Sequence, residues 1–221
     1  MILSKVAADI PEATSNLDID IGSEVFVNRL LDQAREAIAE LNLQSFQETR
    51  QLEVQVQRDE LTGLYNRSYL NQYLQKQFEL SRKLEQPLTM IFLDIDNFKV
   101  INYSCGHHAG DTVLISVARV LQTVARRFDT VVRFGGDEFV ILLENSDEDT
   151  GIMVSERIRA SVEGQPHQFG EEQCMQVTVS VGCATMSANS SFSSPKELLE
   201  AADRSLYAAK SSGRNRVVQA Q

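Results

Sequence analysis

The sequence predicts an α/β protein of the α+β type: a mixed, mostly antiparallel central sheet with flanking helices, preceded by a long N-terminal helix. Apolar segments of strand length alternate with helical segments from residue 88 onward. The two middle strand segments meet at Gly135-Gly136, which indicates a hairpin and therefore an antiparallel pair. Residues 23–57 contain neither glycine nor proline and have the composition of a helix.

The chain begins with residues 1–22, which show no clear period and are expected to form a flexible lead-in. In the helix predicted over 23–57, apolar residues recur at alternating steps of four and three, as in a coiled-coil seam. The seam positions are Val27, Leu31, Ala34, Ile38 and Leu41. Such a helix either dimerises or packs on its own domain. We expect it to dimerise, because it precedes the globular part.

The globular domain is expected at residues 58–221, where strand and helix signals follow one another with short connections. Short apolar runs mark the strands, and apolar residues at steps of three and four mark the helices. The expected elements are helix 68–84, strand 88–95, helix 109–126, a hairpin of 131–132 with 139–143, helix 148–163, strand 176–185, helix 195–211 and strand 216–218. This order contains a βαββαβ unit and predicts a mixed sheet.

Composition excludes several classes of protein. The net charge of −10 argues against nucleic-acid binding, whose affinity comes largely from Lys and Arg that neutralise phosphates. No apolar run approaches the roughly 20 residues that span a bilayer, and the N-terminus lacks the pattern of a secretory signal. We therefore expect a cytoplasmic protein with no membrane association. The three cysteines are widely spaced and match neither a disulfide framework nor a metal-binding cluster.

The most informative segment is Arg-Phe-Gly-Gly-Asp-Glu-Phe at residues 133–139, which places Asp137 and Glu138 at the turn of the predicted hairpin. Asp94 lies at the end of strand 88–95, and Asp96 follows two residues later. If the turn and the strand end are neighbours, their carboxylates can hold Mg²⁺, which prefers oxygen ligands and is often held together with substrate phosphates. The alternative is an ordinary turn and strand end with solvated acids.

Basic and amide side chains offer contacts for a phosphorylated ligand. Lys99, Lys210 and Arg214 could contact phosphate oxygens, although each alone is also typical of a solvated surface. Asn102 and Asp111 bracket a Gly-His-His-Ala-Gly segment. An amide and a carboxylate together match the donor edge of guanine, which adenine lacks. The alternative is a loop residue and a helix N-cap.

Several separated motifs agree with the spacing of one known family. They are Asp59–Arg67, Asp94–Lys99, Asn102, Gly106-His107, Gly110-Asp111, Gly135–Phe139, Ser180-Val181-Gly182 and Asp203–Asn215. Together they resemble the GGDEF-domain diguanylate cyclases over about residues 58–218. The resemblance implies a fold similar to the palm of polymerases and class III nucleotidyl cyclases, which agrees with the predicted mixed sheet.

The resemblance implies that two GTP molecules are condensed to cyclic di-GMP by a homodimer with one GTP on each chain. Asp94, the Ile95 carbonyl and Asp137 would then hold Mg²⁺, or Mn²⁺ in its place, and Glu138 would assist at the metal or take the proton of the attacking hydroxyl. Asn102 and Asp111 would contact guanine, and Lys99, Lys210 and Arg214 the phosphates. Gly135 and Gly136 would let the nucleotide approach the turn.

Arg126 and Asp129 match the Arg-x-x-Asp inhibitory site of the same family, which implies feedback inhibition by bound cyclic di-GMP. A charged helix end is the alternative, since arginines are favoured near the last carbonyls of a helix. A second class of function also remains open: a catalytically silent module that senses cyclic di-GMP or GTP. Asp94, Asp137 and Glu138 together favour the enzyme, because a silent receptor has no chemical need for all three acids.

Overall fold

The computed structural model describes residues 28–29, 31–43, 57–169, 173–187 and 192–220, and the chain divides into two units, 1–53 and 54–221. In the first unit, residues 28–29 and 31–43 are helical, within the predicted helix 23–57. The predicted lead-in and the remainder of that helix lie outside the described residues. The side chains of Leu31, Ile38 and Leu41 on the predicted seam are 49%, 58% and 55% exposed.

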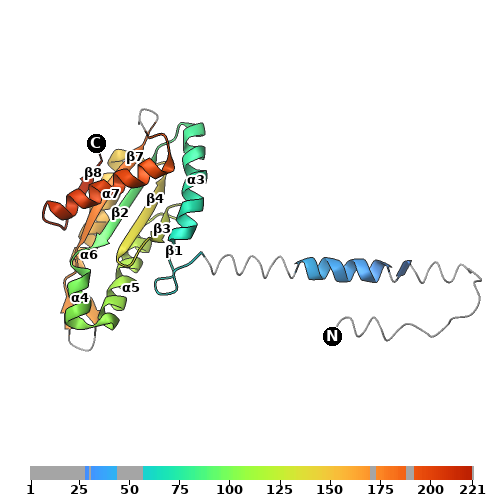
Figure 1. Ribbon diagram of the computed structural model, residues 1–221, viewed down its shortest axis with the longest axis horizontal. Coiled ribbons are helices and arrows are strands. Elements are labelled where there is room, and N and C mark those ends of the chain that lie inside the picture. The colour runs from blue at the N-terminus through green and yellow to red at the C-terminus, as the bar shows by residue number, and fades with distance from the viewer. Residues whose placement is uncertain (1–27, 30, 44–56, 170–172, 188–191, 221) are drawn as a thin grey trace, which may run out of the picture. The chain divides into compact units, whose positions relative to one another are not determined.

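The second unit is built on a six-stranded mixed sheet (Figure 1), and three of its five strand pairings are antiparallel. In spatial order the strands are β1 (Tyr65–Asn66), β3 (Thr130–Arg133), β4 (Glu138–Glu144), β2 (Leu88–Ile95), β7 (Val179–Met186) and β8 (Val217–Gln219). The predicted fold class is therefore confirmed. β5 (His167–Phe169) and β6 (Gln173–Met175) form a separate hairpin.

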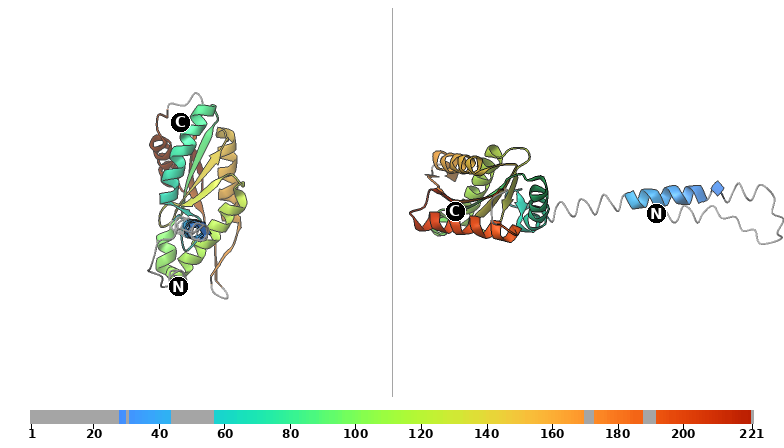
Figure 2. Two further views of the ribbon diagram at one scale, coloured as in Figure 1. Left: turned by 90° about the vertical axis from the view of Figure 1, so that its right-hand side faces the viewer. Right: turned by 90° about the horizontal axis from the view of Figure 1, so that it is seen from above.

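Helices cover both faces of the sheet, as Figure 2 shows from above. The described residues of this unit form five helices: α3 (Arg67–Leu84), α4 (Phe98–Cys105), α5 (His107–Val124), α6 (Glu148–Gly164) and α7 (Pro195–Ser211). Residues of α4, α5 and α6 pack with alternate residues of β2, β4 and β7 in one apolar cluster. Residues of α3 and α7 pack with the other residues of these strands in a second cluster. Because successive strand residues face opposite sides, each central strand is buried on both faces.

The predictions miss two kinds of local structure. The short helix α4 was not predicted, and α5 begins at His107 rather than at residue 109, with Gly106 between the two helices. Asp111 is consequently inside α5, so the N-cap alternative for this residue is wrong. The short strand β1 and the β5–β6 hairpin were also not predicted.

A row of aromatic rings lies where the second unit begins. The Tyr65 and Tyr69 rings stack at 3.8 Å between centroids, and Tyr69 and Tyr73 at 5.3 Å. The Arg58 guanidinium lies 3.7 Å from the Tyr65 ring centroid, a favourable cation–π distance. Burial, followed by the neighbouring Tyr65, raises the pKa of Tyr69 to about 12. The stack ties the start of the domain to α3.

Candidate functional site

The sheet register brings the predicted acids together. Asp94, near the end of β2, is directly paired with Glu138, the first residue of β4. Directly opposed residues on antiparallel strands project from the same face with Cβ atoms about 5 Å apart. Asp137 immediately precedes Glu138, and its carbonyl accepts a hydrogen bond from the Ile95 amide at 3.2 Å. Three carboxylates, from two adjacent strands and the turn before β4, therefore share one end of the sheet.

A lysine partly balances this negative charge. Lys210, near the end of α7, places its Nζ 2.7 Å from Asp94 Oδ2. Burial, together with the nearby charges of Asp137 and Glu138, raises the pKa of Asp94 to about 6 despite the opposing hydrogen bond and charge of Lys210. The surroundings of Asp94 thus disfavour its ionised form, and a further positive charge nearby would stabilise that form.

The loop that carries Asp137 is closed by its own backbone and by Arg133. The amides of Phe134 and Gly135 donate to the Glu138 carbonyl at 2.8 and 3.2 Å. Arg133 donates from Nη2 and Nε to the Gly136 carbonyl at 2.8 and 3.2 Å. A Cβ placed on Gly135 would lie 2.5 Å from Glu138 Oε2. Gly135 therefore leaves room for the Glu138 carboxylate, a role that the sequence did not indicate.

Arg133 also reaches back to the start of the domain. Its Nη1 lies 3.1 Å from both carboxylate oxygens of Asp59. Asp59 in turn accepts from the Thr62 amide and hydroxyl at 2.9 and 2.7 Å. Partial burial opposes ionisation of Asp59, but the hydrogen bonds from Thr62 and Arg133 outweigh it and lower its pKa below the ordinary value. We call this Asp59–Arg133–Gly136 connection the entry brace. Neither Asp59 nor Arg133 was predicted as a site residue.

The predicted guanine-contacting residues come from two touching helices, with Asn102 on α4 and Asp111 on α5. A Cβ on Gly110 would lie 1.9 Å from Asn102 Oδ1, so the absence of a side chain there allows the amide to pack against α5. Among the described residues, the buried Asn102 Oδ1 has no hydrogen-bond partner. Asp111, the next residue after Gly110, is exposed. This placement is consistent with Asn102 and Asp111 binding a polar ligand.

The three predicted phosphate contacts differ in placement. Lys210 is partly buried against Asp94, whereas Lys99 on α4 and Arg214 after α7 are exposed. Arg214 has a left-handed backbone with φ of 62°, and its amide donates to the Ala209 carbonyl at 3.1 Å. The structure thus brings one of the three cations directly to the carboxylates, and α7 carries it there.

The donor set fits a hard divalent cation. No group of three His, Cys, Asp or Glu side chains in the described part of the chain is close enough to form a ready metal-ligand cluster. However, Asp94 is already paired with a cation, the Lys210 ammonium, and it interacts electrostatically with Asp137 and Glu138. Carboxylate and carbonyl oxygens are the ligands that Mg²⁺ and Mn²⁺ accept. The residues present therefore fit such an ion.

The predicted inhibitory pair forms a turn just before β3. The Arg126 amide donates to Asp129 Oδ2 at 2.7 Å, and the Asp129 amide donates to the Arg126 carbonyl at 3.1 Å. Burial raises the pKa of Asp129 against the opposing effects of Arg126 and Arg157. Arg157, on α6, also donates to the Val124 carbonyl at 2.9 Å. Its position next to this turn could not be found from local spacing, because it lies on a different helix.

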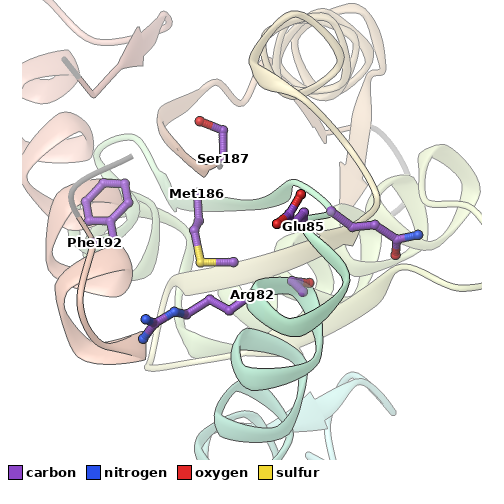
Figure 3. A pocket seen from close by; sticks show the side chains of 7 residues that line it. Arg82, Glu85, Met186, Ser187 and Phe192 are labelled. Carbon is purple, nitrogen blue, oxygen red and sulfur yellow. The ribbon is translucent and has the colours of Figure 1, made fainter. Parts of the chain in front are cut away.

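A pocket of about 260 Å³ lies elsewhere in the domain (Figure 3). It is lined by Ser81, Arg82, Glu85, Gln86, Met186, Ser187 and Phe192. These residues come from the end of α3, the end of β7, the residues just after each, and the segment before α7, at the end of the sheet opposite the carboxylates. None is a predicted site residue. Among the described helices, none is both long enough and apolar enough to span a bilayer.

Known proteins resemble the chain over the same domain. The sequence is 40% identical over 137 residues to diguanylate cyclase A of Treponema denticola, covering 62% of the chain and 36% of that protein. It is 34% identical over 167 residues to the probable diguanylate cyclase DgcC of Escherichia coli, covering 76% of the chain and 44% of that protein. The chain thus spans less than half the length of these curated relatives.

Solved structures and a family model agree with this likeness. The coiled coil and GGDEF domain of DgcB from Caulobacter crescentus, in complex with c-di-GMP, matches with a TM-score of 0.77 and 29% identity, over 85% of this chain and 98% of that one. The active GGEEF domain of a diguanylate cyclase from Vibrio cholerae matches with a TM-score of 0.66 and 33% identity, over 71% and 97%. The model for the GGDEF domain of diguanylate cyclases matches residues 56–216. The chain therefore belongs to the GGDEF-domain family.

Proposed function

We propose that the protein is a diguanylate cyclase that condenses two GTP molecules into cyclic di-GMP and two pyrophosphates. The observation that carries this proposal is the placement of Asp94 opposite Glu138 and next to Asp137, with Lys210 bound to Asp94. Family membership and the names of the relatives support the choice of GTP as substrate. Each domain binds one GTP, and two chains bring their nucleotides face to face.

The reaction requires two phosphoryl transfers. In each, the 3′-oxygen of one GTP forms a bond to the α-phosphorus of the other, and the bond from that phosphorus to pyrophosphate breaks. Glu138 assists at the metal or accepts the proton of the attacking hydroxyl. Asp94, Asp137 and the Ile95 carbonyl would hold Mg²⁺ or Mn²⁺, which would neutralise charge on the phosphates. Because Asp94 and Glu138 are fixed by adjacent strands, they are positioned before substrate arrives.

The remaining predicted contacts orient GTP. Asn102 contacts the guanine through its side-chain amide, whose oxygen has no protein partner within the described residues, and Asp111 adds a carboxylate from the neighbouring helix. Lys99, Lys210 and Arg214 contact the phosphates, with Lys210 exchanging part of its interaction with Asp94 for the phosphate. Gly136, whose Cβ position is open space, leaves room for the nucleotide beside the turn.

Dimerisation follows from the chemistry, since each chain supplies one GTP. Residues 23–57 are proposed to form the coiled coil that aligns two domains, and the exposed Leu31, Ile38 and Leu41 offer its contact surface. Light scattering on the full chain and on a version lacking residues 1–57 tests this role. The full chain is expected to have twice the monomer mass. If both versions contain the same number of chains per particle, residues 23–57 are rejected as the dimerising element.

Cyclic di-GMP is also proposed to inhibit the enzyme by binding at Arg126 and Asp129, with Arg157 as a third contact. Arg126 can clamp a guanine or a phosphate, and Asp129 can accept from the guanine edge. Arg126→Ala should relieve product inhibition and leave the initial rate near that of the wild type. Unchanged inhibition in this variant would reject the assignment.

Incubation of the purified full chain with GTP and Mg²⁺ tests the central proposal. Cyclic di-GMP and pyrophosphate are expected in a ratio of one to two, with a rate that rises more steeply than protein concentration if dimerisation is weak. A silent sensor would bind cyclic di-GMP or GTP tightly and form no product at any protein concentration. That result would replace the enzyme by a binding module.

A further inference from the structure

We propose that Asp96 is a positioning residue that fixes the turn carrying Arg214, and that it touches neither substrate nor metal. This inference rests on the proposed function, because it concerns the contacts of that turn with the phosphates of GTP. Asp96 is 5% exposed and lies one residue after β2. Its placement two residues from Asp94 suggests a second metal ligand, but its contacts indicate another role.

Both carboxylate oxygens of Asp96 are engaged by protein donors. Oδ1 accepts from the Ser180 hydroxyl at 2.6 Å, and Oδ2 accepts from the Thr178 hydroxyl at 2.7 Å. Oδ2 also accepts from the backbone amide of Asn215 at 3.0 Å. A buried carboxylate needs such donors to offset its lost hydration. Asp96 therefore joins the end of β2, the region before and within β7, and the turn after α7.

The turn at 213–215 needs external support. Gly213, Arg214 and Asn215 have φ angles of 116°, 62° and 45°, and the latter two are in the left-handed region that most side chains avoid. Such a conformation persists where the surroundings hold it. The bond from the Asn215 amide to Asp96 supplies part of that support and lies next to Arg214 in the chain.

A second set of contacts holds the other side of Asn215. Its Nδ2 donates to Glu163 Oε1 at 2.7 Å, and its Oδ1 accepts from Arg159 Nη1 at 3.0 Å. Arg159 is itself bound to Glu163 at 2.7 Å and to Glu156 at 2.8 Å. Asn215 is thus held by its backbone from β2 and by its side chain from α6. The backbone of Arg214 can turn little without breaking one of these contacts.

The main test compares Asp96→Ala with Asp96→Asn. Alanine removes every acceptor, so the KM for GTP should rise about 10-fold while kcat changes less than about 3-fold, as expected when a binding contact is misplaced. Asparagine keeps an oxygen for the Asn215 amide, and the Ser180 hydroxyl can rotate to accept from the new amide group. It should therefore restore KM to within about 3-fold of the wild type. A role as metal ligand predicts that Asp96→Asn is as inactive as Asp96→Ala.

A double-mutant cycle separates positioning from a general structural effect. If Asp96 acts through Arg214, then Asp96→Ala should raise KM by less than about 2-fold when Arg214 is already alanine. If the KM of the double variant instead equals the product of the two single-variant increases, the proposal is overturned. Asp149→Asn, which removes an exposed carboxylate from α6, serves as the matched charge control.

Equilibrium titration with a non-hydrolysable GTP analogue gives a readout that does not depend on turnover. Weaker analogue binding by Asp96→Ala supports the inference even if the wild type forms no cyclic di-GMP, which would reject only the proposed function. If Asp96→Ala binds the analogue as tightly as the wild type does, only the inference is rejected. If Asp96→Ala does not fold, Thr178→Val tests the same turn, because it removes the hydroxyl that donates to Oδ2, the oxygen that also holds the Asn215 amide. Unchanged analogue binding in that variant overturns the proposal.

Discussion

Two loops at the carboxylate end of the sheet are held in different ways. The loop 134–137 carries Asp137 and is held by the entry brace, in which the side chains of Arg133 and Asp59 are 15% and 23% exposed. The turn 213–215 carries Arg214 and is held by Asp96, which is 5% exposed. The first loop is tied to the segment through which the chain enters the domain. The second is tied to Asp96, just after β2, and through it to Thr178 and Ser180.

In the described residues, only the first loop is connected to the start of the domain. A shift at Asp59 would be passed through Arg133 to the Gly136 carbonyl, next to Asp137. The turn at Arg214 has no such connection in the described residues, because its supports come from β2 and α6. Catalytic geometry would therefore be adjustable, whereas the phosphate contact would stay fixed.

The largest expected effect contrasts the functional side chains of the two loops. Asp137→Ala should lower kcat by at least about 10³-fold with the fold intact, because it removes a carboxylate from the reacting centre. Arg214→Ala should instead raise the KM for GTP about 10-fold, as expected for a lost phosphate contact. Steady-state kinetics on both variants, with circular dichroism to check folding, measures the contrast. If both variants lose kcat to the same extent, the two loops do not have these different roles.

Glycine substitutions should separate activity from stability. Gly135→Ala would push its new Cβ against the Glu138 carboxylate, so kcat should fall about 10- to 100-fold with little change in Tm. Gly213→Ala would force a side chain into a φ of 116° and should cost about 1–3 kcal/mol of stability. Thermal unfolding and initial rates of both variants check this. A large drop in Tm for Gly135→Ala would contradict it.

Weakening the entry brace should have a smaller effect. Arg133→Lys keeps the charge but cannot bind Asp59 and Gly136 at once with the same geometry. We expect kcat to fall about 3- to 10-fold with KM nearly unchanged, because the loop carrying Asp137 is less well positioned. Arg119→Lys on the exposed surface of α5 is the matched control. A change confined to KM would mean that the brace acts on binding instead.

The smallest effect concerns acid. The pKa of Asp59 is lowered in the folded protein from its ordinary value of 3.8, so its ionised form stabilises the fold. That contribution is complete above the ordinary pKa and is lost as pH falls through the lower, folded value. The Tm difference between the wild type and Asp59→Asn should therefore be constant near neutral pH and shrink below about pH 4. If this Tm difference instead grows as the pH falls, the ionised form of Asp59 does not stabilise the fold.

The carboxylate end was predictable from sequence because its signals are local. Asp94 ends an apolar run, and Asp137 and Glu138 follow two glycines between two apolar segments. Strand alternation and hairpin formation then bring them to one edge. The sheet and most helices were predictable for the same reason, since each is encoded by a continuous pattern.

The supports of the site were not predictable, because they join distant parts of the chain. Asp59 and Arg133 are 74 residues apart, and Asp96 and Asn215 are 119 apart. Each is an ordinary charged or polar residue in its own segment. The helix α4 escaped because it has eight residues, too few for its period to stand out from a loop. Only the packed sheet brings these groups into contact.

The row of stacked tyrosines gives the domain an optical signal of its own. The chain has no tryptophan and five tyrosines, and Tyr65, Tyr69 and Tyr73 form the stack. Tyr103 and Tyr207 are 94% and 74% exposed and should emit like tyrosine in water. Near-ultraviolet dichroism in the tyrosine band should therefore report mainly on the ordered rings beside Arg58. A rearrangement where the chain enters the domain would be visible in solution without any label.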